Sequence, residues 1–98
     1  MIPVHLTDFA NDLYLVLEIL DTYQLAMGNE SYISLSQQDI ANLANCSRPK
    51  INQLMKELTD RGYVQAYQQM RGKYQLTQAG QKVLRIFREA EMPQKAEG

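Results

Sequence analysis

Polar side chains that suit contacts with nucleic acid gather near the middle of the chain. They recur at the outward positions of a helix expected over residues 48–61. Arginine matches the paired acceptors of guanine, asparagine and glutamine match adenine, and either cationic side chain neutralises phosphate. The segment therefore predicts a surface that contacts a nucleic acid duplex. The predicted contact residues are Ser47, Arg48, Pro49, Lys50, Asn52, Gln53 and Lys56.

A second cationic group lies further along the chain. Arg71 and Lys73 flank Gly72 in a loop between two predicted strands, residues 63–69 and 73–76. Two cations around a flexible glycine suit contacts with phosphates or with an adjacent minor groove. We expect Arg71 and Lys73 to contact the same partner, and the alternative is a solvated hairpin tip.

The residues give no support to catalysis or metal binding. No nucleophile–base pair, carboxylate pair or glycine-rich phosphate loop occurs at a telling spacing, so we do not expect an enzyme. One histidine and one cysteine, His5 and Cys46, cannot complete a zinc site of the usual ligand count. We therefore expect no metal and no other cofactor. A single cysteine also excludes an internal disulfide and fits a reducing compartment.

Positive charge is confined to the second half of the chain. Residues 1–47 contain six acids and no lysine or arginine, whereas residues 48–98 contain all ten cations and five acids. The halves therefore carry −6 and +5, although the net charge is only −1. Such asymmetry indicates a polyanionic partner on one face. We expect that face to meet DNA, with the acidic first helix turned away from it.

Capping residues mark the helices that position these side chains. Thr7 and Gly28 bound a helix predicted over residues 8–27, and Ser36, Ser47 and Thr77 cap three more. The other predicted elements are a strand stub at 32–35, helices at 37–44, 48–61 and 78–91, and strands at 63–69 and 73–76. This order predicts one domain over residues 1–98 that is mainly α with a small β-hairpin (α+β). It is the order of a winged helix-turn-helix, with the helix-turn-helix at 36–62 and the wing at 63–76.

The helix predicted over residues 8–27 is apolar on nearly every side. Such a helix must be buried on more than one side, and a domain of 98 residues has little mass to cover it. We expect this helix and the one at 78–91 to form a homodimer, and the alternative is a monomer in which they cover each other. A dimer would present two recognition helices to half-sites about 34 Å apart. The predicted interface residues are Phe9, Leu13, Val16, Leu17, Leu20, Leu84 and Phe87.

Two stretches resemble known families of regulators. Residues 39–64, from Asp-Ile-Ala to Gly-Tyr-Val, resemble the DNA-binding domain of the cyclic-AMP-receptor family. Residues 74–80 resemble the strand and helix start that follow the wing in MarR-like and PadR-like repressors. The resemblance implies a winged-helix fold with its recognition helix in the major groove. Carried over by position, it implies that Arg48 and Gln53 read bases and that Ser47 contacts a phosphate.

The leading hypothesis is sequence-specific binding of double-stranded DNA by a small dimeric transcriptional regulator, most simply a repressor. One alternative is a centromere-binding or replication-control protein of a plasmid or phage. Another is a winged helix used only for protein–protein contact. We expect a prokaryotic cytoplasmic protein, with a plasmid or phage context, and no membrane partner. The sequence leaves the DNA target and any small-molecule effector open.

Overall fold

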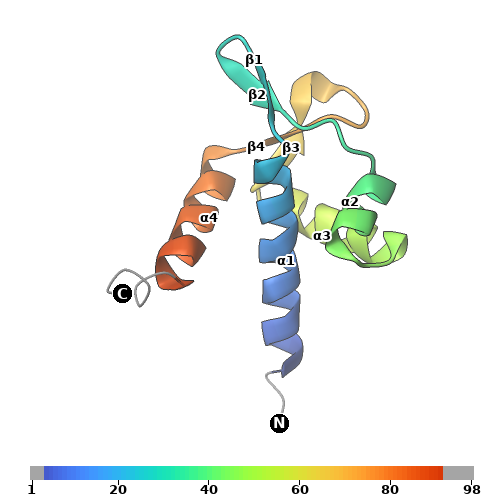
Figure 1. The fold of residues 1–98 in the computed structure, drawn as a ribbon, viewed down its shortest axis with the longest axis vertical. Coiled ribbons are helices and arrows are strands. Elements are labelled where there is room, and N and C mark those ends of the chain that lie inside the picture. The colour runs from blue at the N-terminus through green and yellow to red at the C-terminus, as the bar shows by residue number, and fades with distance from the viewer. Residues whose placement is uncertain (1–3, 92–98) are drawn as a thin grey trace.

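The computed structural model describes the backbone of residues 4–91 and the side chains of residues 11–90 (Figure 1). Four helices and two small antiparallel hairpins follow one another along the chain. No helix in this described part is long and apolar enough to cross a membrane. The elements are α1 (Val4–Thr22), β1 (Leu25–Met27), β2 (Glu30–Tyr32), α2 (Gln37–Ala44), α3 (Arg48–Asp60), β3 (Val64–Ala66), a 3₁₀ turn (Tyr67–Gln69), β4 (Tyr74–Leu76) and α4 (Gln78–Glu91).

Helix α1 is the central element around which the others pack. In Figure 1, α4 lies on one side of α1, α2 and α3 lie on the other, and both hairpins lie beyond its carboxyl end. The first turns of α1 extend beyond α2, α3 and α4 along the long axis of the molecule. All four helices, the wing strands β3 and β4, and Ile33 contribute apolar side chains to one core. Its buried members are Leu13, Val16, Leu17, Ile19, Leu20, Ile33, Ile40, Ala41, Ala44, Ile51, Leu54, Met55, Leu58, Val64, Leu76 and Leu84.

Helices α2 and α3 begin where the capping residues predict. Ser36 Oγ accepts from the Asp39 main-chain nitrogen at 3.0 Å, and Asp39 Oδ2 accepts from the Ser36 nitrogen at 3.1 Å. This reciprocal pair satisfies two amide groups that the helix itself cannot. Asn45, at φ 59°, ends α2 in the left-handed region and turns the chain toward α3. Ser47 Oγ then accepts from the Lys50 nitrogen at 3.2 Å, which starts α3.

The two hairpins are joined by a single antiparallel bridge. The Ile33 nitrogen donates to the Tyr74 carbonyl at 2.8 Å, and the Tyr74 nitrogen donates back at 2.9 Å. Gln75 Nε2 adds a bond of 3.2 Å to the main-chain oxygen of Ser31. The β3–β4 wing is therefore braced along one side by the chain that follows β1–β2.

The helix predicted over residues 8–27 is wrong at both ends, and the first hairpin takes up its last residues. The helix starts earlier, at Val4, and ends at Thr22, and the strand β1 takes up the last three predicted helical residues. Gly28 has φ 64°, but it forms a two-residue hairpin turn with Asn29 instead of ending a helix. The strand stub predicted at 32–35 lies earlier, as β2, with only Ile33 in a bridge beyond it.

The first strand of the wing is shorter than the sequence predicts. It ends at Ala66, and the 3₁₀ turn that follows contains Gln68 at φ 51° and Gln69 at φ 58°. Two successive residues in the left-handed region break the alternation that a strand requires. The helices predicted at 37–44 and 78–91 have the bounds observed for α2 and α4, and α3 ends one residue earlier than predicted.

The start of α4 is pressed against the strand that leads into the wing. Thr77 Oγ1 accepts from the Gly80 nitrogen at 3.1 Å and donates to the Gly62 carbonyl at 2.6 Å. A Cβ added at Gly80 would lie 2.2 Å from the main-chain oxygen of Tyr63. That oxygen already accepts from the Thr77 nitrogen at 3.0 Å, so it is not free to move aside.

We expect Gly80→Ala to lower the free energy of unfolding by about 1–3 kcal/mol, the usual range for overpacking. Alanine in place of a helical glycine otherwise gains about 0.5–1 kcal/mol, so the clash has to exceed that gain. Urea denaturation measures the change, and Gln78→Ala at an exposed site of the same helix is the control. A Gly80→Ala protein as stable as the parent would contradict the close approach.

Helix α4 is tied to α1 by a three-residue ion-pair cluster. The Arg88 guanidinium donates to Glu18 through Nε at 3.1 Å and Nη2 at 2.8 Å, and Nη2 lies 2.8 Å from Asp21 Oδ2. These hydrogen bonds from Arg88, followed by one from the Tyr14 hydroxyl, lower the pKa of the Glu18 carboxyl. The stabilisation is therefore complete above the unfolded-state pKa of about 4.3 and is lost as the pH falls through the lower folded-state pKa.

We expect Glu18→Gln to cost about 0.5–1 kcal/mol of stability at pH 7, because the cluster is largely exposed. The difference from the parent protein should shrink as denaturation is repeated at decreasing pH below about 4. Glu89→Gln on α4 makes the same charge change where no ion pair to a described residue is lost. A Glu18→Gln penalty that persists unchanged at pH 2 would show that lost packing, not ionisation, causes it.

Candidate nucleic-acid interface

One face of α3 is buried and the opposite face is open to solvent. Ile51, Leu54, Met55 and Leu58 point into the core at helical spacing. The outward positions are those that the sequence predicts to contact nucleic acid. Arg48, Asn52, Gln53 and Lys56 are all exposed, together with Ser47, Pro49 and Lys50 at the start of the helix.

The amino-terminal part of α3 borders an open hollow beside α2. Gln37 from α2 lines this hollow together with Arg48, Pro49 and Asn52 from α3. Within the part of the chain that the structure describes, Arg48 makes no hydrogen bond or ion pair. Its guanidinium therefore keeps all its donors for an external acceptor. Gln37 is a candidate contact residue that the sequence analysis missed, because its neighbours across the hollow lie on another helix.

Lys50 and Lys56 differ from Arg48 in having partners within the chain. Lys50 Nζ lies 2.8 Å from Asp12 Oδ2 on α1, and Lys56 Nζ lies 3.1 Å from Asp60 Oδ2 one turn further along α3. The second pair is highly exposed, so it competes weakly with an external phosphate. Lys50 is drawn toward α1, so part of its charge is already compensated inside the molecule.

The wing presents one of its two predicted cations more freely than the other. Arg71 is exposed at the tip, whereas Lys73 is half-buried. Lys73 Nζ donates to Ser34 Oγ at 3.2 Å and lies 5.5 Å from the centre of the Tyr32 ring. A cation near an aromatic face is attracted to it, so Lys73 is held at the base of the wing.

Aromatic contacts fix the base of the wing to the first hairpin. The rings of Tyr32 and Tyr67 stack with their centres 5.1 Å apart and an angle of 20° between their planes. The Tyr67 hydroxyl donates to Glu30 Oε1 at 2.9 Å, and this bond raises the pKa of Tyr67 because it favours the protonated phenol. The first hairpin thus positions the wing. Its signal in the sequence is the Gly-Asn pair at residues 28–29, which suits a two-residue turn.

Most of the predicted dimer residues lie inside the single chain. Phe87 is half-buried, with its ring centre 4.9 Å from that of Tyr14, and the side chain of Phe9 lies outside the described residues. Because the remaining residues are already covered by the chain's own core, they offer no surface to a second subunit. These covered residues are Leu13, Val16, Leu17, Leu20 and Leu84.

The packing of α2 against α3, the capped turn between them and the hairpin that follows define the class of protein. It is a winged helix-turn-helix protein, mainly α with a small β part. The sequence profile of the Crp-like helix-turn-helix domain matches residues 13–79, from the middle of α1 to the start of α4. The chain belongs to this family.

Solved structures show the same fold. The chain is similar to the reduced (FeII) CO-sensing protein from R. rubrum, with 20% identity and a TM-score of 0.68 over 76% of this chain. It is also similar to a CRP/FNR-family transcriptional regulator from Thermus thermophilus, with 21% identity and a TM-score of 0.57 over 76% of this chain. It spans only 35% and 38% of these two proteins.

A third similar structure is matched over more of its own length. MepR of S. aureus, solved as a MepR–DNA complex, is 26% identical with a TM-score of 0.64. The match covers 94% of this chain and 75% of MepR. The comparison with curated proteins gave no match.

Proposed function

We propose that the chain binds double-stranded DNA in a sequence-specific manner and regulates transcription, acting as a repressor. The observation that carries this proposal is the outward face of α3, where Arg48, Asn52 and Gln53 are exposed on a helix whose other face is fixed in the core. These three side chains can donate to or accept from base edges in the major groove. Repression needs only occupancy of a site that a polymerase would otherwise use.

The surroundings of α3 supply contacts of a second kind. Lys56 and Arg71 are exposed cations on α3 and on the wing, and the hydroxyl of Ser47 lies at the amino terminus of α3. Such groups bind phosphate oxygens and fix the register of a protein on the duplex without reading sequence. The similarity to MepR, solved in complex with DNA, supports the same use of this fold here.

We further propose that the chain acts as a dimer through α4 and the adjoining part of α1. Val83, Ile86 and Phe87 follow one another along one side of α4 at helical spacing, and Ile86 is 56% exposed. Beside them lies an apolar hollow between the helices, lined in part by Tyr14 and Tyr63. An apolar patch of this kind on a small domain marks an interaction surface. We therefore propose Val83, Ile86 and Phe87 as the centre of the dimer interface, in place of the buried residues that the sequence predicts.

Arg48→Ala should weaken binding to the preferred DNA sequence by about 1–3 kcal/mol and reduce discrimination between bases at one position. Binding sites selected from random duplexes, followed by titration with each variant, measure both effects. Arg61→Ala is the matched control, because Arg61 is paired with Glu57 and borders the α1–α4 hollow instead of the open face of α3. Equal losses of DNA affinity in the two variants would mean that the effect comes from removing a positive charge, not from a specific contact of Arg48.

The same titrations, repeated over a range of salt concentrations, test DNA binding as such. Each phosphate contact should contribute about −0.9 to the slope of log affinity against log salt. No binding to any duplex at low salt would overturn the proposed function and favour a protein-contact module.

Ile86→Glu should convert the dimer into a monomer, because a charge would be buried at the centre of the proposed interface. Sedimentation equilibrium of the full chain measures the mass. Met27→Glu is the control, since Met27 is 54% exposed but lies on β1, away from α4. A parent protein that stays monomeric over the whole concentration range, with or without DNA, would contradict the dimer.

A further inference from the structure

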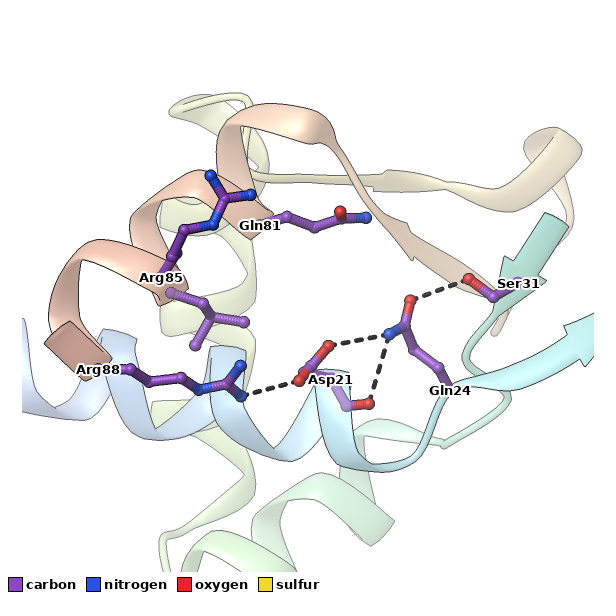
Figure 2. A pocket seen from close by; sticks show the side chains of 7 residues that line it. Asp21, Gln24, Ser31, Gln81, Arg85 and Arg88 are labelled. Carbon is purple, nitrogen blue, oxygen red and sulfur yellow. Dashed lines mark hydrogen bonds and ion pairs between the residues drawn. The ribbon is translucent and has the colours of Figure 1, made fainter. Parts of the chain in front are cut away.

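A polar hollow lies on the side of the molecule away from α3, between the end of α1, β2 and α4. Figure 2 shows the side chains around it, and its volume is about 300 Å³. That volume is at the lower end of the range for small-ligand sites. Leu84, itself buried in the core, contributes an apolar surface. The polar residues that line it are Asp21, Gln24, Ser31, Gln81, Arg85 and Arg88.

One wall of the hollow is fixed by hydrogen bonds within the chain. Arg88 Nη2 holds Asp21 Oδ2 at 2.8 Å, and Gln24 Nε2 donates to Asp21 Oδ1 at 2.9 Å. Ser31 Oγ then donates to Gln24 Oε1 at 3.0 Å (Figure 2). A wall ordered in this way loses little conformational entropy when a ligand binds. The Asp21 carboxylate retains lone pairs beyond these two bonds, so the wall can accept a donor from a ligand.

The opposite wall carries donors that are not used. Gln81 and Arg85 lie on successive turns of α4, and Gln81 extends across the hollow toward Gln24 in Figure 2. Neither side chain makes a hydrogen bond or ion pair with the rest of the described chain. Arg88, by contrast, already binds both Glu18 and Asp21. Arg85 is therefore the cation of this hollow that can bind an external anion.

We propose that this hollow binds a small organic acid that also carries a hydrogen-bond donor. Its carboxylate binds the Arg85 guanidinium, which suits two parallel hydrogen bonds to one carboxylate. Its hydroxyl or ammonium group binds the wall formed by Asp21 and Gln24. The bound acid links α4 to the end of α1 and to β2. This binding does not depend on contact with DNA.

Nuclear magnetic resonance of the ¹⁵N-labelled full chain tests the site with four probes: lactate, alanine, acetate and inorganic phosphate. Ionic strength is kept constant with sodium chloride. We expect lactate or alanine to cause saturable shifts of the Arg85 Nε–H and of the side-chain amides of Gln24 and Gln81. The better of these two probes should bind about tenfold more tightly than acetate, which lacks the donor. Tighter lactate binding indicates a hydroxy acid, and tighter alanine binding indicates an amino acid.

The matched variants are Arg85→Gln and Lys82→Gln, two exposed sites on α4 at which the same charge is removed. Lys82 borders a neighbouring hollow together with Arg85 but does not line this one. We expect Arg85→Gln to weaken binding by about tenfold and Lys82→Gln to leave it unchanged. The proposal is overturned if the shifts do not saturate or if both variants lose binding equally. Acetate or phosphate binding as tightly as lactate and alanine also overturns it.

Discussion

The burial of one face of α3 is the constraint on which the rest of the structure depends. Ile51, Leu54 and Leu58 are almost completely covered by the same core that covers Val16 and Leu20 of α1. Because a helix turns about 100° per residue, fixing these positions also fixes the direction of every other side chain on α3. Arg48, Asn52 and Gln53 point outward for this reason, without a hydrogen bond or ion pair of their side chains to the described residues.

The wing is positioned by contacts that are distant in sequence. The bridge between Ile33 and Tyr74 attaches it to the chain after β2, and the Tyr32–Tyr67 stack closes the space beside that bridge. The 3₁₀ turn with two glutamines in the left-handed region then leads to the tip, where Arg71 is exposed. Left-handed backbone at non-glycine residues is unfavourable and persists only where the surroundings hold it. The first hairpin supplies those surroundings, so it forms part of the candidate interface without supplying its cations.

The sequence predicts the elements whose signals are local. Ser36 with Asp39, Ser47 with Pro49, and Thr77 each place a helix start correctly, because capping acts within one turn. The carboxyl end of α1 is predicted wrongly, because apolar residues continue at helical spacing through Met27 while strand pairing takes them over. The Gly-Asn pair at residues 28–29 is a local signal for the turn between β1 and β2, whereas the bridge between Ile33 and Tyr74 depends on contacts that composition and spacing do not encode. The same holds for the interface residues, since periodicity shows that a face is apolar but not which neighbour covers it.

Charge segregation along the chain has a different structural meaning from a simple division into an acidic side and a basic side. Asp12 binds Lys50 of α3, and Glu18 and Asp21 bind Arg88 of α4, so the acids of α1 hold cations from both neighbouring helices. Each such pair takes a cation out of the set available to a polyanion. Five cations of the described residues have no ion pair: Arg48 at the start of α3, Arg71 and Lys73 on the wing, and Lys82 and Arg85 on α4. Of these, Lys73 is held by Ser34 and the Tyr32 ring. Arg48 and Arg71 belong to the surface proposed for DNA, whereas Lys82 and Arg85 lie on α4, which is on the opposite side of α1 from α3 in Figure 1. Arg85 lines the hollow proposed to bind a small acid, so a partner other than DNA is proposed for it, whereas Lys82 does not line that hollow.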